Sequence, residues 1–408
     1  MTRHTLPATV IAIGFVSFFN DVASEMVTPF IPILVATVLG QGPVILGLVE
    51  GMADAAASLL KLWAGHYSDA GHGRRKPLMV FGYGLSNLAR PLLGLVTGWG
   101  TLLLLRSLDR AGKGLRDAPR DALLADSAHA EIHGLAYGFH RAMDNAGALG
   151  GTLLAIAALS WMHWPLREVI LASAVPGALV LLVLVVGVRE PPPGAEPANL
   201  KAEPDRAPVR LSWALLSPTM RRYLLVLVLF TFARASETFI LLRSNELGMS
   251  LVQVLLLWAV LNVCKSAASL PGGRMADIFG RQRITLISWS GYALSFVLLG
   301  TVQHSSALWF ATVLYGLLIG LGEGSERALI SLYADERERG TAFGWYHLAV
   351  GISAIPAGVL FGAVWHYRNA GDAFLFAGML SLLSALLLRF WCFRGTLFWG
   401  QIDRGKMK

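Results

Sequence analysis

Long apolar segments recur along almost the whole of this 408-residue chain, and they constrain its fold more than any other feature. Each is long enough to cross the hydrocarbon core of a bilayer as a helix, which takes about 20 residues. Only 15% of the residues are charged, against about 25% in soluble domains. We therefore expect an all-α membrane protein with twelve transmembrane helices. The segments lie at 8–37, 44–64, 77–97, 100–125, 134–160, 166–188, 222–247, 251–271, 284–303, 306–333, 340–366 and 372–395.

The longest polar stretch divides the chain into two groups of six segments. It covers residues 189–221 and includes Pro191-Pro192-Pro193, which is typical of a flexible linker. We predict an N-terminal six-helix bundle at 1–188, a cytoplasmic linker at 189–221, and a C-terminal six-helix bundle with a short cytoplasmic tail at 222–408.

Lysine and arginine are concentrated in alternate loops. The tails, the linker and loops 66–76, 272–283 and 334–339 carry most of them, whereas the opposite loops carry only Arg167 and Arg368. Because positively charged loops stay on the cytoplasmic side, we expect an inner-membrane protein with both termini in the cytoplasm. The net charge of +8 then reflects topology, and we expect no nucleic-acid partner. The two cysteines indicate neither a disulfide framework nor a metal site.

A short polar motif occurs once in each half of the chain. The C-half copy has the order G-x-x-x-D-x-x-G-R, and the N-half copy contains one additional residue before its Gly-Arg pair. Two parallel six-helix repeats with a site between them form a recognised transporter plan. The motif residues are Gly65, Asp69 and Arg74 in the N half and Gly273, Asp277, Gly280 and Arg281 in the C half.

On this motif the sequence resembles the major facilitator superfamily, and the resemblance covers nearly the whole chain. It implies that family's fold of two six-helix bundles, a monomer, and transport rather than enzyme catalysis. It also implies that the motif's aspartates and arginines act in gating, by pairing with helix ends in the outward-open state. Arg106, in the fourth segment (100–125), matches a conserved arginine position of that family. Residues 146–151 resemble the family's antiporter signature but lack its proline. Within the family the chain looks most like bacterial exporters.

Ionisable side chains inside the apolar segments form a second group of candidates, because a charge in a bilayer is costly and usually functional. Segment 100–125 carries eight of them on one helical face, within an arc of about 140°. Such a stripe must face a water-filled cavity or opposing charges. The eight residues are Arg106, Asp109, Arg110, Lys113, Arg116, Asp117, Arg120 and Asp121.

Acids in the neighbouring segments could compensate these cations and carry protons. Two carboxylates close together in a medium of low dielectric favour a bound proton near neutral pH. We expect proton coupling at Asp21, Glu25, Asp54 and Asp144. We expect the substrate cavity to involve Arg106, Arg110, Lys113, Arg116, Arg120, His140, Arg141, Arg234, Glu237, Glu323, Glu326 and His347. For any one of these residues, pairing within the bundle explains the charge at least as well as substrate contact does. His140 and His347 could each also be a hydrogen-bonded histidine of the protein core rather than a proton carrier.

The pattern as a whole predicts a secondary active transporter that moves a small organic solute by alternating access. We expect proton-coupled efflux, as antiport of a drug or metabolite. No Gly-x-x-x-x-Gly-Lys-Ser/Thr loop occurs in the sequence, so the proton gradient rather than ATP or a cofactor is the expected energy source. The expected partners are the solute, protons and the lipid bilayer.

Two other functions remain open. The cations of segment 100–125 would also suit proton-coupled symport of an anionic nutrient, a carboxylate or phosphate. An integral membrane enzyme is a more remote alternative, in which His140 and Asp144 serve as an acid–base pair. Neither a nucleophile elbow nor a set of metal ligands accompanies that pair in the sequence.

Overall fold

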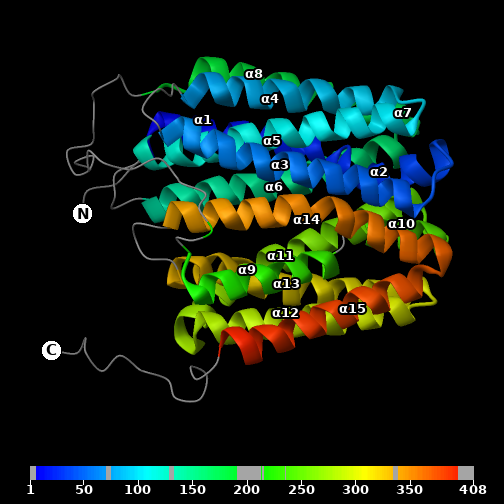
Figure 1. Ribbon diagram of the computed structural model, residues 1–408. Coiled ribbons are helices and arrows are strands. Elements are labelled where there is room, and N and C mark those ends of the chain that lie inside the picture. The colour runs from blue at the N-terminus through cyan, green and yellow to red at the C-terminus, as the bar shows by residue number, and fades with distance from the viewer. Residues whose placement is uncertain are drawn as a thin grey trace.

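Twelve helical segments lie side by side in the computed structural model (Figure 1). The structure describes residues 6–69, 75–127, 133–190, 213, 216–234, 236–333 and 339–393. Within these residues every regular element is helical. The expected all-α fold with twelve spans is therefore confirmed.

The helices follow one another in the order that the sequence predicts. The N half contains α1 (Ala8–Glu25) with its short extensions η1 (Thr28–Phe30), α2 (Ile31–Ile33) and η2 (Leu34–Val38), then α3 (Pro43–Asp69), α4 (Arg75–Leu92) with η3 (Leu93–Leu95), α5 (Trp99–Ser127), α6 (His133–Ser160), α7 (Leu166–Ala172) and α8 (Ala174–Gly187). The C half contains α9 (Pro218–Ala233), α10 (Thr238–Glu246), α11 (Leu251–Phe279), α12 (Arg281–Thr301), α13 (Ser305–Tyr333), α14 (Arg339–Tyr367) and α15 (Ala370–Leu387) with η7 (Leu388–Cys392). Because the number of crossings is even, α1 begins and η7 ends at the same end of the bundle (Figure 1), which we call the terminal end. The opposite end is the far end.

Ten of the helical segments in the described residues are long and apolar enough to cross a membrane. The two others are α4 and α5, which pack against each other and carry more charged side chains. Their polar groups are largely turned inward, since Arg90 of α4 and Arg106 of α5 are 3% and 1% exposed. These two helices are therefore spans that hide part of their charge inside the N half, while Arg110 and Lys113 of α5 line the cavity described below.

The two halves have the same internal arrangement. In the N half α1 packs on α6 and α8, and α5 packs on α3 and α4; in the C half α9 packs on α14 and α15, and α13 packs on α11 and α12. Each contact in one half thus has its counterpart in the other, as two six-helix repeats require. Most of the predicted linker, 189–221, lies outside the described residues, so the proposed domain limits stay a prediction.

Two predicted segments are interrupted rather than continuous. The first span changes course after α1, where Pro29 and Pro32 lack the backbone N–H that a helix needs. Span seven is divided between α9 and α10, with Arg234 at the end of α9. Both breaks lie beside the cavity described below.

The expected loop at 272–283 is almost absent. Helix α11 continues through Pro271 to Phe279, because Gly272 lies directly against the Leu321 carbonyl of α13 and the close packing outweighs the lost hydrogen bond. Only Gly280 separates α11 from α12, and its φ of +94° is a conformation that suits glycine. Gly273 and Asp277 therefore lie within α11, and Gly65 and Asp69 within α3, rather than in loops.

Glycines form the main seam between the two halves, along antiparallel α3 and α14. A Cβ atom on Gly47 would lie 1.9 Å from the Gly358 carbonyl oxygen, and one on Gly362 would lie 2.3 Å from the Pro43 carbonyl oxygen. Small residues at such crossings let backbones touch. The seam covers the part of both helices nearer the far end, and α6 with α11 makes the equivalent contact on the other side.

Candidate substrate cavity

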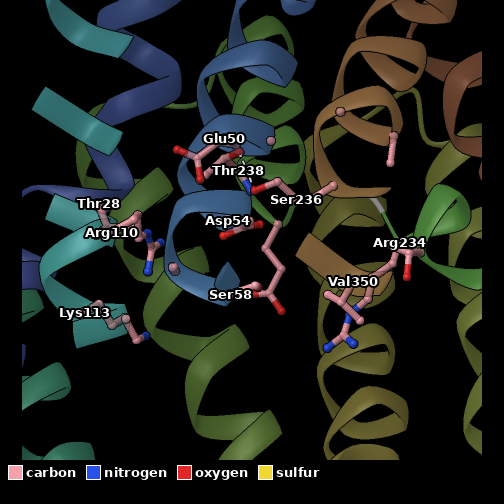
Figure 2. A pocket seen from close by; sticks show the side chains of 18 of the residues that line it. Thr28, Glu50, Asp54, Ser58, Arg110, Lys113, Arg234, Ser236, Thr238 and Val350 are labelled. Carbon is pink, nitrogen blue, oxygen red and sulfur yellow. Dashed lines mark hydrogen bonds between the residues drawn. The ribbon is translucent and has the colours of Figure 1, made fainter. Parts of the chain in front are cut away.

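A cavity of about 580 Å³ lies between the two halves. Helices α1, α3 and α5 form one wall, and α9, α10, α11, α13 and α14 form the other. Figure 2 shows Asp54, Arg110 and Lys113 on the N-half side and Arg234 and Val350 on the C-half side. The volume is within the range of about 300–1,000 Å³ that is usual for small-molecule sites.

Several charges of the wall are held in ion pairs. The Lys265 Nζ atom lies 2.8 Å from one carboxylate oxygen of Glu237 and 2.9 Å from the other. Lys61 lies 3.7 Å from Asp117, near the terminal side of the cavity. Pairs of this kind neutralise each other, so they shape the cavity without giving it a net charge.

Other charges of the wall have no ionic partner within 4 Å among the described residues. They are the cations Arg110 and Lys113, one helical turn apart on α5, and the carboxylates Asp21 of α1 and Asp54 of α3. The Nε atom of Arg110 is buried without a hydrogen-bond partner in the described part of the chain. An unsatisfied donor of a buried charged group is costly, so Arg110 is a group that a solute would satisfy. Lys113 and Asp54 are exposed to the cavity, where a solute or a proton can reach them.

A hydrogen bond inside the cavity joins the two halves. The indole Nε1–H of Trp258 on α11 donates to a carboxylate oxygen of Glu25 on α1. Protonation of Glu25 would remove the negative charge that strengthens this bond. Glu25 therefore connects the charge state of the cavity to the contact between the two halves.

Behind the cavity, a fully buried ionic network ties four helices of the N half together. Arg106 of α5 donates to both oxygens of Glu50, at 3.0 and 3.2 Å, and to Asp109. Arg90 of α4 bonds Asp109 at 2.8 Å and Asn20 of α1 at 3.0 Å. Arg90 is not among the site residues predicted from the sequence, although it is the only charged residue in segment 77–97 and is recognisable on that ground.

The charged stripe of α5 therefore divides into parts with different surroundings. Arg110 and Lys113 face the cavity, and Arg106 is buried in the network. Arg116 bonds the Ser86 hydroxyl at 2.6 Å, and Arg120 lies 3.7 Å from Asp117 and 2.9 Å from Asp121.

The structure brings together many, but not all, of the predicted site residues. Eight line the cavity, namely Asp21, Glu25, Asp54, Arg110, Lys113, Arg234, Glu237 and His347. Seven lie outside it, namely Arg106, Arg116, Arg120, His140, Arg141, Asp144 and Glu326. Glu326 accepts from Trp289 at 2.7 Å and lies 3.6 Å from Arg234.

The predicted gating residues whose backbone the structure describes lie toward the terminal end. Gly280 and Arg281 form the junction of α11 and α12. Arg74 lies outside the described residues, and so do the side chains of Asp69, Asp277 and Glu323. Their gating role stays a prediction.

A family model described as Major Facilitator Superfamily matches residues 13–264 and 238–396. An uncharacterized MFS-type transporter from Methanocaldococcus jannaschii is 32% identical over 395 residues, covering 94% of this chain and 95% of that protein. The crystal structure of the nucleoside transporter NupG has a TM-score of 0.72 at 14% identity and covers 93% of this chain and 98% of that one. The last likeness concerns the fold alone.

Two shorter matches are to proteins with a named activity. The class B tetracycline resistance protein of Escherichia coli is 33% identical over 127 residues, covering 30% of each chain. An Na⁺, Li⁺, K⁺/H⁺ antiporter of Planococcus maritimus is 30% identical over 153 residues, covering 36% of this chain and 35% of that protein.

Proposed function

This chain belongs to the major facilitator superfamily and is a multi-pass membrane transporter, and we propose that it exports a small organic solute in exchange for protons. The observation that carries this proposal is the set of carboxylates Asp21, Glu25 and Asp54, which line the cavity between the halves and have no ionic partner in the part of the chain that the structure describes. The antiporter and resistance proteins among the shorter matches agree with it.

The proposed exchange follows from charge. A proton bound by a cavity carboxylate removes a negative charge, and a solute can release that proton by taking its place or by changing its surroundings. Because both halves contribute to the wall, a rocking motion of one half against the other would expose the cavity at each end in turn. We further propose that the terminal end faces the cytoplasm of the inner membrane, since the helix ends that flank most of the cation-rich loops of the sequence lie there.

Flux into proteoliposomes under an imposed pH gradient tests this function. The probes are tetracycline, ethidium, succinate and phosphate, with lumenal pyranine to report protons. We expect tetracycline or ethidium flux to follow the gradient, and Asp21→Asn and Glu25→Gln to lower that flux by about a hundredfold. Asp372→Asn is the control, because Asp372 forms an exposed pair with Arg368 at 3.1 Å. Wild-type flux in Asp21→Asn and Glu25→Gln, or wild-type flux indifferent to pH, would contradict the proposal.

A second candidate is proton-coupled symport of an anion. It is favoured by Arg110 and Lys113, two cavity cations without an ionic partner among the described residues. A carboxylate or phosphate group would satisfy both side chains. Succinate or phosphate uptake down an inward proton gradient, lost in Arg110→Gln, would favour this candidate over drug export.

A further inference from the structure

A row of buried polar side chains lies between α1 and α6, behind the cavity wall. The Ser17 hydroxyl is 2.7 Å from Nε2 of His140, and Nδ1 of His140 is 3.5 Å from a carboxylate oxygen of Asp144. Ser17 and His140 are 1% and 5% exposed. One turn further along α1 from Ser17 is Asp21, which lines the cavity and whose carboxylate is close enough to Asp144 for the two charges to repel each other.

The backbones hold this row at a fixed spacing. A Cβ atom on Gly147 would lie 2.3 Å from the Phe18 carbonyl oxygen, and one on Gly151 would lie 2.5 Å from the Val22 carbonyl oxygen. Helices α1 and α6 therefore touch through glycine directly beside the polar side chains. In so close a contact the imidazole of His140 has little freedom to turn away from its neighbours.

The row does not form a hydrolase site, although a serine, a histidine and an aspartate follow one another. Neither Ser17 nor His140 lines the central cavity, and a hydroxyl that is 1% exposed cannot meet a substrate carbonyl. What the three groups can do in a dry interface is pass a proton. This also weakens the enzyme alternative considered from the sequence.

The hydrogen bonds of His140 suit both of its charge states. In the neutral ring with its proton on Nε2, that N–H donates to the Ser17 hydroxyl while the lone pair of Nδ1 faces Asp144. In the imidazolium, Nε2–H keeps its bond to the hydroxyl and Nδ1–H points to the Asp144 carboxylate. A proton can therefore be gained and lost without movement of the ring.

Charged groups from three helices face His140. Asp121 of α5 and Arg141 of α6 have side chains that are 47% and 73% exposed, so they extend the row toward the terminal end, where α5 ends and α6 begins. The groups that act on His140 are Asp21 of α1, Arg120 and Asp121 of α5, and Arg141 and Asp144 of α6.

We propose that Ser17, His140 and Asp144 form a proton relay that connects Asp21 in the cavity wall with the terminal end of the bundle. The O–H bond of protonated Asp21 breaks as an O–H bond forms on Asp144. That proton then passes to Nδ1 of His140, whose Nε2–H bond breaks as an O–H bond forms on the Ser17 hydroxyl, and the hydroxyl passes its own proton on toward Asp121 at the terminal end. The ring, now protonated on Nδ1, returns to its initial form when the Asp144 carboxylate takes the Nδ1 proton and gives it to the Ser17 hydroxyl as that hydroxyl gives its own proton to Nε2. Each step breaks one bond to hydrogen and forms one. The proposal rests on the proton coupling proposed above.

The experiment separates proton coupling from solute movement. Proteoliposomes with each variant are assayed with tetracycline for flux driven by a pH gradient, and for counterflow at equal pH, in which solute exchanges for solute. His140→Gln keeps a hydrogen-bonding side chain that does not titrate, and Ser17→Ala removes only the hydroxyl. The control is His304→Gln, at an exposed histidine between α12 and α13.

We expect gradient-driven flux to fall by about a hundredfold in His140→Gln and about tenfold in Ser17→Ala, with counterflow preserved in both and His304→Gln unchanged. Two results would overturn the relay. One is gradient-driven flux at the wild-type level in His140→Gln and Ser17→Ala; the other is a parallel loss of flux and counterflow, which indicates a structural role. If Asp21→Asn loses gradient-driven flux while His140→Gln keeps it, the relay is wrong but the proposed proton coupling stands. If flux through the wild-type protein does not depend on the pH gradient, the proposed function is wrong as well.

Discussion

At the scale of single residues, two arginines one turn apart on α5 have opposite surroundings. Arg106 is 1% exposed and holds Glu50 and Asp109, whereas Arg110 faces the cavity with a donor that lacks a partner among the described residues. A buried ion pair adds little over an apolar pair, but loss of one partner leaves the other as an uncompensated charge. Arg106 therefore maintains the fold, and Arg110 is available to act on a solute.

This difference predicts different effects of the same substitution. Arg106→Gln should destabilise the protein by about 3–5 kcal/mol, because it strands the carboxylates of Glu50 and Asp109. Arg110→Gln should leave the thermal unfolding temperature in detergent close to wild type and abolish solute binding. Equal losses of stability in the two variants would contradict the separate roles.

The charged face of α5 was predictable from the sequence, but the residues of other helices that pair with it were not. Helical spacing alone places the eight ionisable residues on one side of segment 100–125. Which of them are neutralised depends on Glu50 of α3 and Arg90 of α4, and the distances to those helices follow from packing rather than from spacing. The prediction therefore included buried Arg106 and Arg116 with the cavity residues and omitted Arg90.

At the scale of helices, the seam between α3 and α14 determines how closely the two halves approach. Gly47 and Gly358 touch backbone to backbone, and Gly51 lies against the carbonyl of Ala354. Such contacts depend on the absence of side chains, so the seam can close tightly and can also part without breaking ion pairs. A seam of this kind suits an interface that must open during each transport cycle.

A single methyl group in the seam should therefore impair transport. In Gly358→Ala the new Cβ would lie 2.2 Å from the Gly47 carbonyl oxygen, so α3 and α14 must separate. Overpacking of about 1–3 kcal/mol shifts a two-state equilibrium by about 5- to 150-fold. We expect proteoliposome flux to fall by a similar factor.

The control for the seam is Gly84→Ala, since a Cβ on Gly84 of α4 has open space within 4 Å. This variant should transport like the wild type. Normal flux in Gly358→Ala would mean that closure of α3 on α14 is not part of the cycle.

The helices themselves were largely predictable, because runs of apolar residues and alternate basic loops report spans directly. Their interruptions were not. The break between α9 and α10 has no proline or glycine to mark it, and α11 continues through Pro271 where the sequence suggested an end. At Pro271 local propensity is overridden by the packing of Gly272 on Leu321, which one sequence does not report.

At the scale of the whole molecule, the cavity lies between two similar bundles that both contribute to its wall. The N half is held together by the ionic network around Arg106, and the C half by aromatic packing in which the rings of Phe230 and Trp289 stack at 3.9 Å. Each half is therefore internally well connected. Between them lie the glycine seam near the far end, the contact of α6 with α11, where the Ser266 hydroxyl donates to Asn145 at 3.1 Å, and the Glu25–Trp258 hydrogen bond. Motion is expected between the halves rather than within them.

Distances between spin labels on opposite halves test this alternation directly. After replacement of Cys264 and Cys392 by alanine, one label pair is placed at Tyr67 and Ile278 near the terminal end, and another at Trp161 and Tyr367 near the far end, all on exposed side chains. Electron–electron distances are measured in lipid nanodiscs at mildly alkaline and mildly acidic pH. We predict opposite changes, one pair moving apart as the other approaches when the cavity carboxylates take up protons. Distances that stay constant at both ends, or change in the same direction, would contradict a carrier whose two halves rock around a shared, proton-binding cavity.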